Sequence, residues 1–202
     1  MTDSCPDAAP DTIEANVRAK YRRVAEKASG HFTYPVGRRS LERLGYPVEW
    51  LDGVPSAVID RFVGVGNPLA IRRPEPGERV LDVGCGCGLD ALVAAHLVGP
   101  TGRVVGIDLT PEMLDVARAA VPSHLSKVVT LLEASVLSLP FEEGSFDLAL
   151  SNGVLNLVPD KDAAFREIGR VLRTGATLAV VDLLVVEAVP KEILEDPAAW
   201  AT

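Results

Sequence analysis

The chain has 202 residues, 48% apolar and 24% charged, which is the composition of a folded domain with a buried core and not of a disordered chain. Its formal net charge of −8 disfavours partners held by bulk electrostatics, so we expect neither nucleic acid nor an anionic membrane as a ligand. No apolar run approaches the roughly 20 residues of a membrane span, and the acidic N-terminus lacks the basic start of a secretion signal; a cytoplasmic location is therefore expected.

The cysteines and histidines argue against a disulfide framework and against a metal site. The three cysteines, at positions 5, 85 and 87, are odd in number, and Cys85 and Cys87 are too close along the chain to bridge comfortably. Only three histidines accompany them, and the C-x-C pair lies in a glycine-rich loop, so no metal is expected.

The N-terminal part of the chain predicts a tail followed by a helical cap. Residues 1–10 are acidic and proline-rich, and we expect them to be disordered. From Asp11 onward, apolar residues recur every three or four positions, which predicts an amphipathic helix. Proline and glycine then interrupt the chain repeatedly, leaving room for two short helices at about residues 38–44 and 55–62. We therefore assign residues 11–75 to a helical cap.

The pattern of apolar residues changes at about residue 76, where short apolar runs begin to alternate with helical patterns. These runs lack the strict alternation of a half-exposed sheet, which is typical of parallel strands buried on both faces. The regular alternation of strands and helices predicts an α/β fold with a doubly wound, mostly parallel sheet over residues 76–202. The expected strands are 79–84, 103–108, 127–132, 146–151 and 176–186, and the expected helices are 88–98, 111–121 and 161–172.

The turn after the first expected strand is the candidate ligand-binding loop and reads Asp82-Val83-Gly84-Cys85-Gly86-Cys87-Gly88. In doubly wound sheets ligands bind beyond the carboxyl ends of the strands, and glycines at alternate positions let the backbone approach them because no Cβ intervenes. A dinucleotide fingerprint needs a further glycine at position 89, where this chain has Leu89. The G-x-G-x-G pattern instead resembles motif I of the class I S-adenosylmethionine-dependent methyltransferases.

Two carboxylates stand close to this loop. Asp108 ends the second expected strand, 20 residues after Gly88, where it can accept hydrogen bonds from ribose hydroxyls. Capping of the helix that begins at Thr110 and Pro111 is its alternative role. For Asp82 the methyltransferase resemblance implies a contact with the methionine end of the cofactor, and capping of the loop amides is compatible with that contact.

Four longer segments resemble the arsenite methyltransferase branch of this class. They are GVGNPLA (64–70), VLDVGCGCGLDALVAAHLVGPTGRVVGIDLTPEML (80–114), SNGVLNLVPDK (151–161) and VLRTGATLAVVD (171–182). The resemblance implies a Rossmann-like domain that binds S-adenosyl-L-methionine, and an enzyme that transfers its methyl group to a small-molecule acceptor.

The same resemblance implies the cofactor contacts. Met113 would pack on the adenine, with a plain helix-core role as the alternative, and Asn152 would lie beside the methionine part. Ser135 stands where the family often has an aspartate on the adenine amino group. The expected cofactor-binding residues are Asp82, Gly84, Cys85, Gly86, Gly88, Asp108, Leu109, Met113, Ser135 and Asn152.

The chain departs from the resembling family at the acceptor site. Arsenite methyltransferases hold trivalent arsenic with cysteine thiolates, but the two matching positions are Val65 and Gly153, neither of which binds arsenic. The identity of the acceptor is therefore left open. For an acceptor that needs a base, His31 and Tyr34 in the cap are the catalytic candidates, with surface or packing roles as the alternative.

The sequence stops at Thr202, before the strands six and seven that the resemblance implies. The strand expected at 176–186 would then be an apolar edge with open backbone groups, which we expect a homodimer partner or a separately encoded chain to cover. A truncated product, or a UGA codon read as selenocysteine just past Thr202, would also explain this ending. A non-catalytic cofactor-binding module and a nicotinamide-dependent oxidoreductase are the alternative functions.

Overall fold

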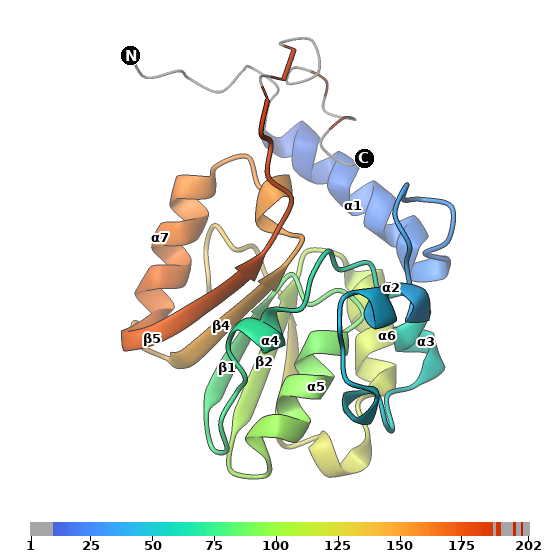
Figure 1. Ribbon diagram of the computed structural model, residues 1–202. Helices are drawn as coiled ribbons and strands as arrows, with labels where there is room; N and C mark the ends of the chain where they lie inside the picture. Colours follow the sequence, from blue (N-terminus) through green and yellow to red (C-terminus); the bar gives the residue numbers. More distant parts are fainter. Residues whose placement is uncertain (1–9, 188, 191–195, 197–198, 200–202) are drawn as a thin grey trace.

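In the computed structural model, which describes residues 10–187, 189–190, 196 and 199, the strands form one parallel sheet (Figure 1). Its order is β3-β2-β1-β4-β5, so the direction of winding reverses beside β1. The strands are β1 (Arg79–Val83), β2 (Arg103–Asp108), β3 (Val129–Glu133), β4 (Phe146–Asn152) and β5 (Leu172–Val181). The predicted doubly wound α/β fold is confirmed, and no strand follows β5 among the described residues.

Helices cover both faces of the sheet, which explains why its strands are apolar on both sides. The helices of this part are α5 (Leu89–Val98), α6 (Pro111–Ala120) and α7 (Lys161–Val171). Val80 of β1 packs in the core that contains the buried residues of α5, whereas the next residue, Leu81, packs in the core that contains Ile168 of α7. Consecutive residues of one strand thus face two separate cores, as the unbroken apolar runs predict.

The cap packs as part of the same body. Its helices are α1 (Pro10–Glu26), α2 (Arg38–Arg43), α3 (Ser56–Ile59) and α4 (Pro68–Ile71). Val24, Leu41 and Val58 of the cap belong to the same hydrophobic core as α5. Arg61 fastens the end of α1, because its guanidinium donates to the Glu26 carbonyl oxygen at 3.0 Å. Figure 1 shows that α1 runs across the edge of the sheet where the strands end.

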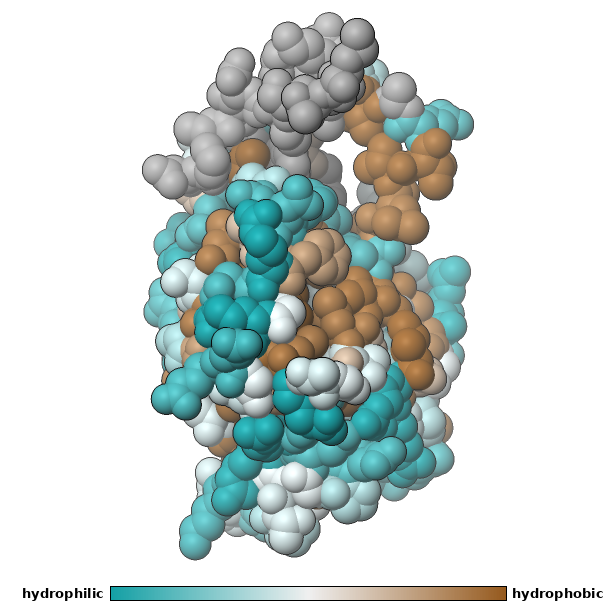
Figure 2. All heavy atoms as spheres, turned by 90° about the vertical axis from the view of Figure 1, so that its left-hand side faces the viewer, coloured by the Kyte–Doolittle hydropathy of each residue, from teal (hydrophilic) through white to brown (hydrophobic). Residues whose placement is uncertain are grey.

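The last strand differs from its prediction. The sequence predicts a strand at 176–186, whereas β5 spans Leu172–Val181. The reason is Asp182, whose carboxylate accepts the Asn156 amide at 3.1 Å and thereby turns the chain away from the sheet. The large apolar side chains at 183–186 are consequently exposed. Figure 2 views the molecule from this side and shows apolar atoms gathered on the surface.

Three short 3-10 helices complete the described chain: η1 (Val48–Trp50), η2 (Ser123–Leu125) and η3 (Leu155–Leu157). Of the tail predicted at 1–10, positions 1–9 lie outside the described residues, and Pro10 already belongs to α1. None of the described helices is long and apolar enough to cross a membrane.

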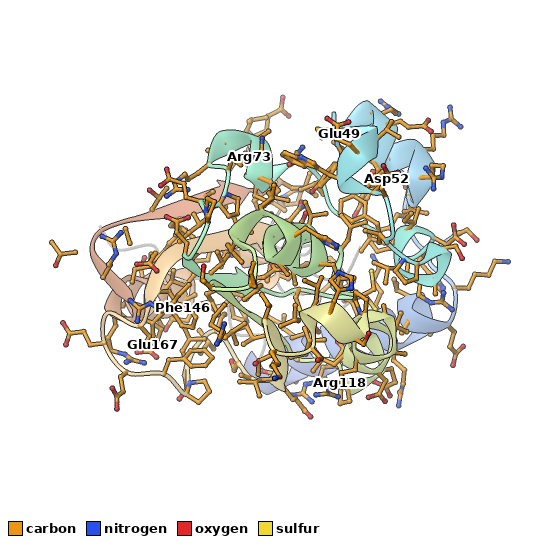
Figure 3. The ribbon with its side chains drawn as sticks, turned by 90° about the horizontal axis from the view of Figure 1, so that it is seen from below. Glu49, Asp52, Arg73, Arg118, Phe146 and Glu167 are labelled. Atoms are coloured by element: carbon orange, nitrogen blue, oxygen red, sulfur yellow. The ribbon has the colours of Figure 1, made fainter. Side chains whose placement is uncertain are left out.

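The loop between β3 and β4 is anchored to α7. Seen from below in Figure 3, Glu167 of α7 and Phe146 of β4 lie on the same side of the molecule, away from Arg118 of α6. The Glu167 carboxylate accepts the Leu139 amide at 2.9 Å, and Arg170 donates to the Leu139 carbonyl oxygen at 3.0 Å. These contacts fix a loop that begins at the ligand-binding edge of the sheet.

Candidate functional site

A cavity of about 130 Å³ lies at the carboxyl ends of the strands, where the winding of the sheet reverses. The ends of β1, β2 and β4 and the loop after β3 border it. Glu14, Val17 and Tyr21 of α1 also line the cavity, in agreement with the course of α1 in Figure 1. The cavity therefore lies where the sequence predicts ligand binding, with part of the cap as its cover.

The glycine loop between β1 and α5 presents bare backbone to the cavity. Gly84 and Gly86 line it with φ angles of +68° and +53°, a region that residues with a Cβ rarely adopt. A Cβ on Gly84 would come within 2.4 Å of Val154 Cγ2, and one on Gly86 within 3.1 Å of Met113 Cε. Gly88 does not line the cavity; it is the N-cap residue of α5. The loop thus leaves a space that side chains would fill, and this fits the close approach of a ligand.

Asp108, at the end of β2, connects the loop with the start of α6. Its carboxylate accepts the Thr110 amide at 2.8 Å and the Gly86 amide at 2.9 Å. Burial raises the pKa of Asp108, and the amide hydrogen bonds oppose this effect. The carboxylate lines the cavity and has more acceptor sites than these two amides use, so it remains able to accept ribose hydroxyls.

Leu109, Met113 and Ser135 border the cavity on the side of β2 and β3. Met113 is only 1% exposed and belongs to the hydrophobic core. Its position is therefore compatible with both predicted roles, the adenine contact and packing in the helix core. Ser135 Oγ accepts the Leu137 amide at 3.2 Å, which leaves the hydroxyl proton for a ligand. This placement supports the predicted adenine contacts, which stay predictions.

Asn152, at the end of β4, is the centre of a network that the sequence does not predict. Its Oδ1 accepts the amides of Val65 and Gly66 at 2.9 and 3.1 Å, and its Nδ2 donates to Asp90 Oδ2 at 3.0 Å. Tyr46 donates its hydroxyl to Asp90 Oδ1 at 2.7 Å. Asp90 lines the cavity together with Asn152. Sequence reasoning missed Asp90, although an acidic residue directly after the glycine loop was a usable signal; for Tyr46 there was none.

Asp82 lies beneath the cavity and not in its wall. Its side chain is 2% exposed, and no partner in the described structure reaches its buried Oδ2. Burial, followed by the neighbouring carboxyls of Asp90 and Asp108, raises the pKa of Asp82 well above its usual range. Its predicted contact with the methionine end stays a prediction, and Asp90 is the acidic side chain that borders the cavity at this point.

The two loop cysteines line the cavity as buried, neutral thiols. Cys87 Sγ donates to the Val58 carbonyl oxygen at 3.3 Å. Burial raises the pKa of Cys87 to about 12, and it raises the pKa of Cys85 well above its usual range. Because the thiolate is the nucleophile and the soft ligand, neither side chain is suited to hold arsenic at neutral pH.

The two candidate bases do not line the cavity. His31 and Tyr34 both follow α1 in the chain, and the Tyr34 hydroxyl donates to the Val63 carbonyl oxygen at 3.3 Å. Burial raises the pKa of Tyr34 to about 12, so the group is neutral at physiological pH. The described geometry therefore gives neither residue a contact that supports a catalytic role.

Positions 65 and 153, which match arsenic-binding cysteines in the resembling family, adjoin one another. A Cβ built on Gly153 would lie 3.3 Å from Val65 Cγ2 and 3.9 Å from Val65 Cβ. Gly153 lines the cavity, so the isopropyl group of Val65 stands next to its wall. An apolar group and bare backbone thus occupy the point where two thiolates would meet.

Comparisons with known proteins agree with this geometry. The family model of a methyltransferase domain matches residues 74–202. The arsenite methyltransferase of Halobacterium salinarum is 38% identical over 156 residues, which are 77% of this chain and 40% of that protein. The arsenite methyltransferase of Mus musculus is 32% identical over 199 residues, which are 94% of this chain and 52% of that protein.

A solved structure leads to the same family. The crystal structure of an arsenic(III) S-adenosylmethionine methyltransferase from Chlamydomonas reinhardtii is 36% identical, with a TM-score of 0.55 over 72% of this chain and 48% of that chain. The chain spans about half the length of these relatives, or less. Its glycine loop, Asp108 and Met113 fit an adenosyl group. Because the family model covers more than half of the chain, we conclude that the chain belongs to the class I S-adenosyl-L-methionine-dependent methyltransferases, and within them it is similar to the arsenite methyltransferases.

Proposed function

We propose that this chain transfers the methyl group of S-adenosyl-L-methionine to a small organic acceptor that enters the same cavity. The observation that carries the proposal is the glycine-walled cavity at the carboxyl ends of the strands, bordered by Asp108 and Asn152 and covered by α1. When bound, the cofactor supplies an electrophilic methyl group on a positively charged sulfur.

The described residues contribute positioning and the exclusion of water. Asp108 holds the glycine loop and offers acceptor sites to the ribose. Val154 and Leu157, with Val17 and Tyr21 of α1, surround the cavity with largely apolar surface. Holding two reacting atoms about 3–3.5 Å apart in such a site lowers the barrier of a displacement reaction, and an apolar wall suits a transition state in which the positive charge of the sulfur is spread over the methyl group and the acceptor.

The acid–base groups of the cavity favour an acceptor that is nucleophilic without a strong base. His31 and Tyr34 lie outside the lining. Tyr21 lies within it, but burial raises the pKa of its hydroxyl above the usual range. With neutral loop cysteines and with Val65 beside Gly153, the described lining of the cavity offers trivalent arsenic no thiolate pair, which supports an organic acceptor.

Titration and a transfer assay test this function. We expect the purified chain to bind S-adenosylmethionine and S-adenosylhomocysteine in preference to NAD, and to transfer labelled methyl to at least one acceptor in a panel of thiols, phenols, enols and arsenite. Preferred binding of NAD would contradict the proposal. Binding of the adenosyl compounds without transfer to any acceptor would instead favour the non-catalytic module.

We also propose that a second copy of this chain covers the free edge of β5. Within the described residues β5 pairs with β4 alone, and beyond it Leu184 and Val186 are 85% and 90% exposed. Open backbone groups next to exposed apolar side chains favour pairing with another chain. The expected result is that Leu184→Lys/Val186→Lys converts a dimer into a monomer in sedimentation equilibrium.

Val48→Lys is the matched control for this prediction. Val48 is 71% exposed in η1, so its substitution adds a charge at a comparably open site away from β5. It is expected to leave the dimer intact. A wild-type chain that sediments as a monomer would overturn the second copy as the occupant of the edge.

A further inference from the structure

Two segments of the chain, residues 64–66 and residues 153–157, border the cavity on the side of β4, and we call them the acceptor wall. Their members in the cavity lining are Gly64, Gly153, Val154 and Leu157. Val154 reaches the glycine loop, because a Cβ built on Gly84 would lie 2.4 Å from Val154 Cγ2. The acceptor wall therefore stands directly next to the bare backbone that the loop presents to a ligand.

Both segments of the acceptor wall contact Val181, the last residue of β5. The Gly153 amide donates to the Val181 carbonyl oxygen at 2.8 Å. A Cβ built on Gly66 would lie 2.7 Å from Val181 Cβ, so the Val181 side chain packs against the backbone of the first segment. The helix that follows this segment, α4, also packs against β5. One residue thus holds one segment by its carbonyl oxygen and the other by its side chain.

Asp182, the next residue, joins the second segment to the end of β5. Its Oδ2 accepts the Asn156 amide at 3.1 Å, and its Oδ1 accepts the Leu183 amide at 2.7 Å. The first bond fixes η3, and the second fixes the direction in which the chain leaves the sheet. Asp182 is half-buried and does not line the cavity. Its influence on a ligand must therefore pass through the acceptor wall.

The glycine loop is held from a different strand. Asp108, at the end of β2, accepts the amides of Gly86 and Thr110 at 2.9 and 2.8 Å. In the sheet, β1 and β4 lie between β2 and β5. A change at the end of β5 is thus expected to move the acceptor wall more than the glycine loop.

We propose that Val181 and Asp182 are positioning residues that set the separation of Val65 and Gly153, and with it the space that an acceptor finds; this inference rests on the proposed function. Both residues act through backbone contacts and lie outside the cavity lining. The shape of the acceptor end of the cavity thus depends on two side chains that do not border it.

Two thiols placed on the acceptor wall measure its geometry. In Val65→Cys/Gly153→Cys the two Cβ atoms would lie 3.9 Å apart, which allows phenylarsine oxide to bind both thiols. In this background Asp182→Ala is expected to weaken phenylarsine oxide at least about tenfold, because a loosened wall lowers the effective concentration of the second thiol. Asp182→Asn keeps an oxygen for the Asn156 amide and is expected to change the affinity by less than about twofold.

Asp160→Ala is the matched control in the same background. Asp160 follows the acceptor wall and also accepts one amide, that of Ala163 at 2.8 Å, but it caps α7. Its replacement is expected to leave the affinity for phenylarsine oxide within about twofold. Val181→Ala is the second test variant and is expected to weaken the arsenical at least about fivefold, because the packing against Gly66 is lost. Circular dichroism checks that each variant is folded.

The affinity for S-adenosylhomocysteine separates positioning of the acceptor wall from a general loosening of the cavity. In the otherwise unchanged chain, Asp182→Ala is expected to alter this affinity by less than about twofold, because Asp108 holds the glycine loop. A loss of S-adenosylhomocysteine as large as the loss of the arsenical would show a general structural role and overturn the proposal.

Three further results would overturn it. They are an unchanged arsenical affinity in both Asp182→Ala and Val181→Ala, equal weakening by Asp160→Ala, and a loss in Asp182→Asn as large as in Asp182→Ala. A parent double variant that binds no tighter than its single variants would do the same, because positions 65 and 153 then do not meet. The arsenical measurement needs no cofactor, so a wild-type chain that binds no adenosyl compound would contradict the proposed function alone.

Discussion

Gly86→Val is expected to weaken the binding of S-adenosylhomocysteine by at least about 100-fold, because the valine side chain occupies space on the ligand side of the loop. Gly86 has a φ of +53°, and even a single Cβ there lies 3.1 Å from Met113 Cε. Its amide donates to Asp108 at 2.9 Å, so a shift of the loop also displaces this carboxylate. Isothermal titration of the purified variant measures the loss.

Gly99→Val is the matched control for the loop variant. Gly99 follows α5 with a φ of +67°, and a Cβ built on it meets nothing within 4 Å. Both substitutions impose a backbone strain of about 1–3 kcal/mol, so both are expected to lower the melting temperature. Only Gly86→Val is expected to lose the ligand. Similar affinities in the two variants would place the cofactor away from the glycine loop.

The double substitution Val65→Cys/Gly153→Cys is expected to create a site for a trivalent arsenical. A Cβ on residue 153 would lie 3.9 Å from Val65 Cβ, close to the separation of about 3.8 Å that is typical of paired cysteines. Two thiols at this point match the soft arsenic centre. Phenylarsine oxide is expected to bind at least about 100-fold tighter than to either single variant, because the second thiol binds intramolecularly.

Titration under reducing conditions measures this gain, and the two single variants are its controls. Gly153 has a φ of +70°, so circular dichroism is needed to show that each variant remains folded. Of the three wild-type thiols, Cys85 and Cys87 are buried and neutral and contribute little, and Cys5 is common to all variants. If the double variant binds no tighter than the single variants, positions 65 and 153 do not meet in solution.

Local signals in the sequence are sufficient for most of the fold and for the position of the glycine loop beside Asp108. The apolar runs predict the first four strands because residues of each strand pack in the cores on both faces of the sheet. The glycines at 84 and 86 and the carboxylate of Asp108 lie where short-range geometry requires them, at the ends of adjacent parallel strands. The pattern of these residues therefore predicts their proximity without knowledge of distant contacts.

The rest of the site depends on contacts between distant parts of the chain. Tyr46 and Asp90 are 44 positions apart, and nothing in either local pattern indicates their hydrogen bond. The burial of Asp82 beneath the cavity depends on how α5 packs on β1. The end of β5 likewise follows from the contact of Asp182 with the Asn156 amide, whereas strand propensity alone extends the strand too far.

The shared core of cap and sheet constrains how such a protein can acquire a new acceptor. Val24, Leu41 and Val58 pack with α5, so exposure of one part removes apolar contacts from the other, and we expect the two to unfold as a single cooperative unit. A cap taken from another protein would therefore need the same buried side chains to pack against α5. Val17 is different, because it lines the cavity and does not belong to this core, so its replacement reshapes the ligand space while the buried set is kept. Divergence in acceptor preference can thus proceed at a few covering positions, with the rest of the segment held constant by stability.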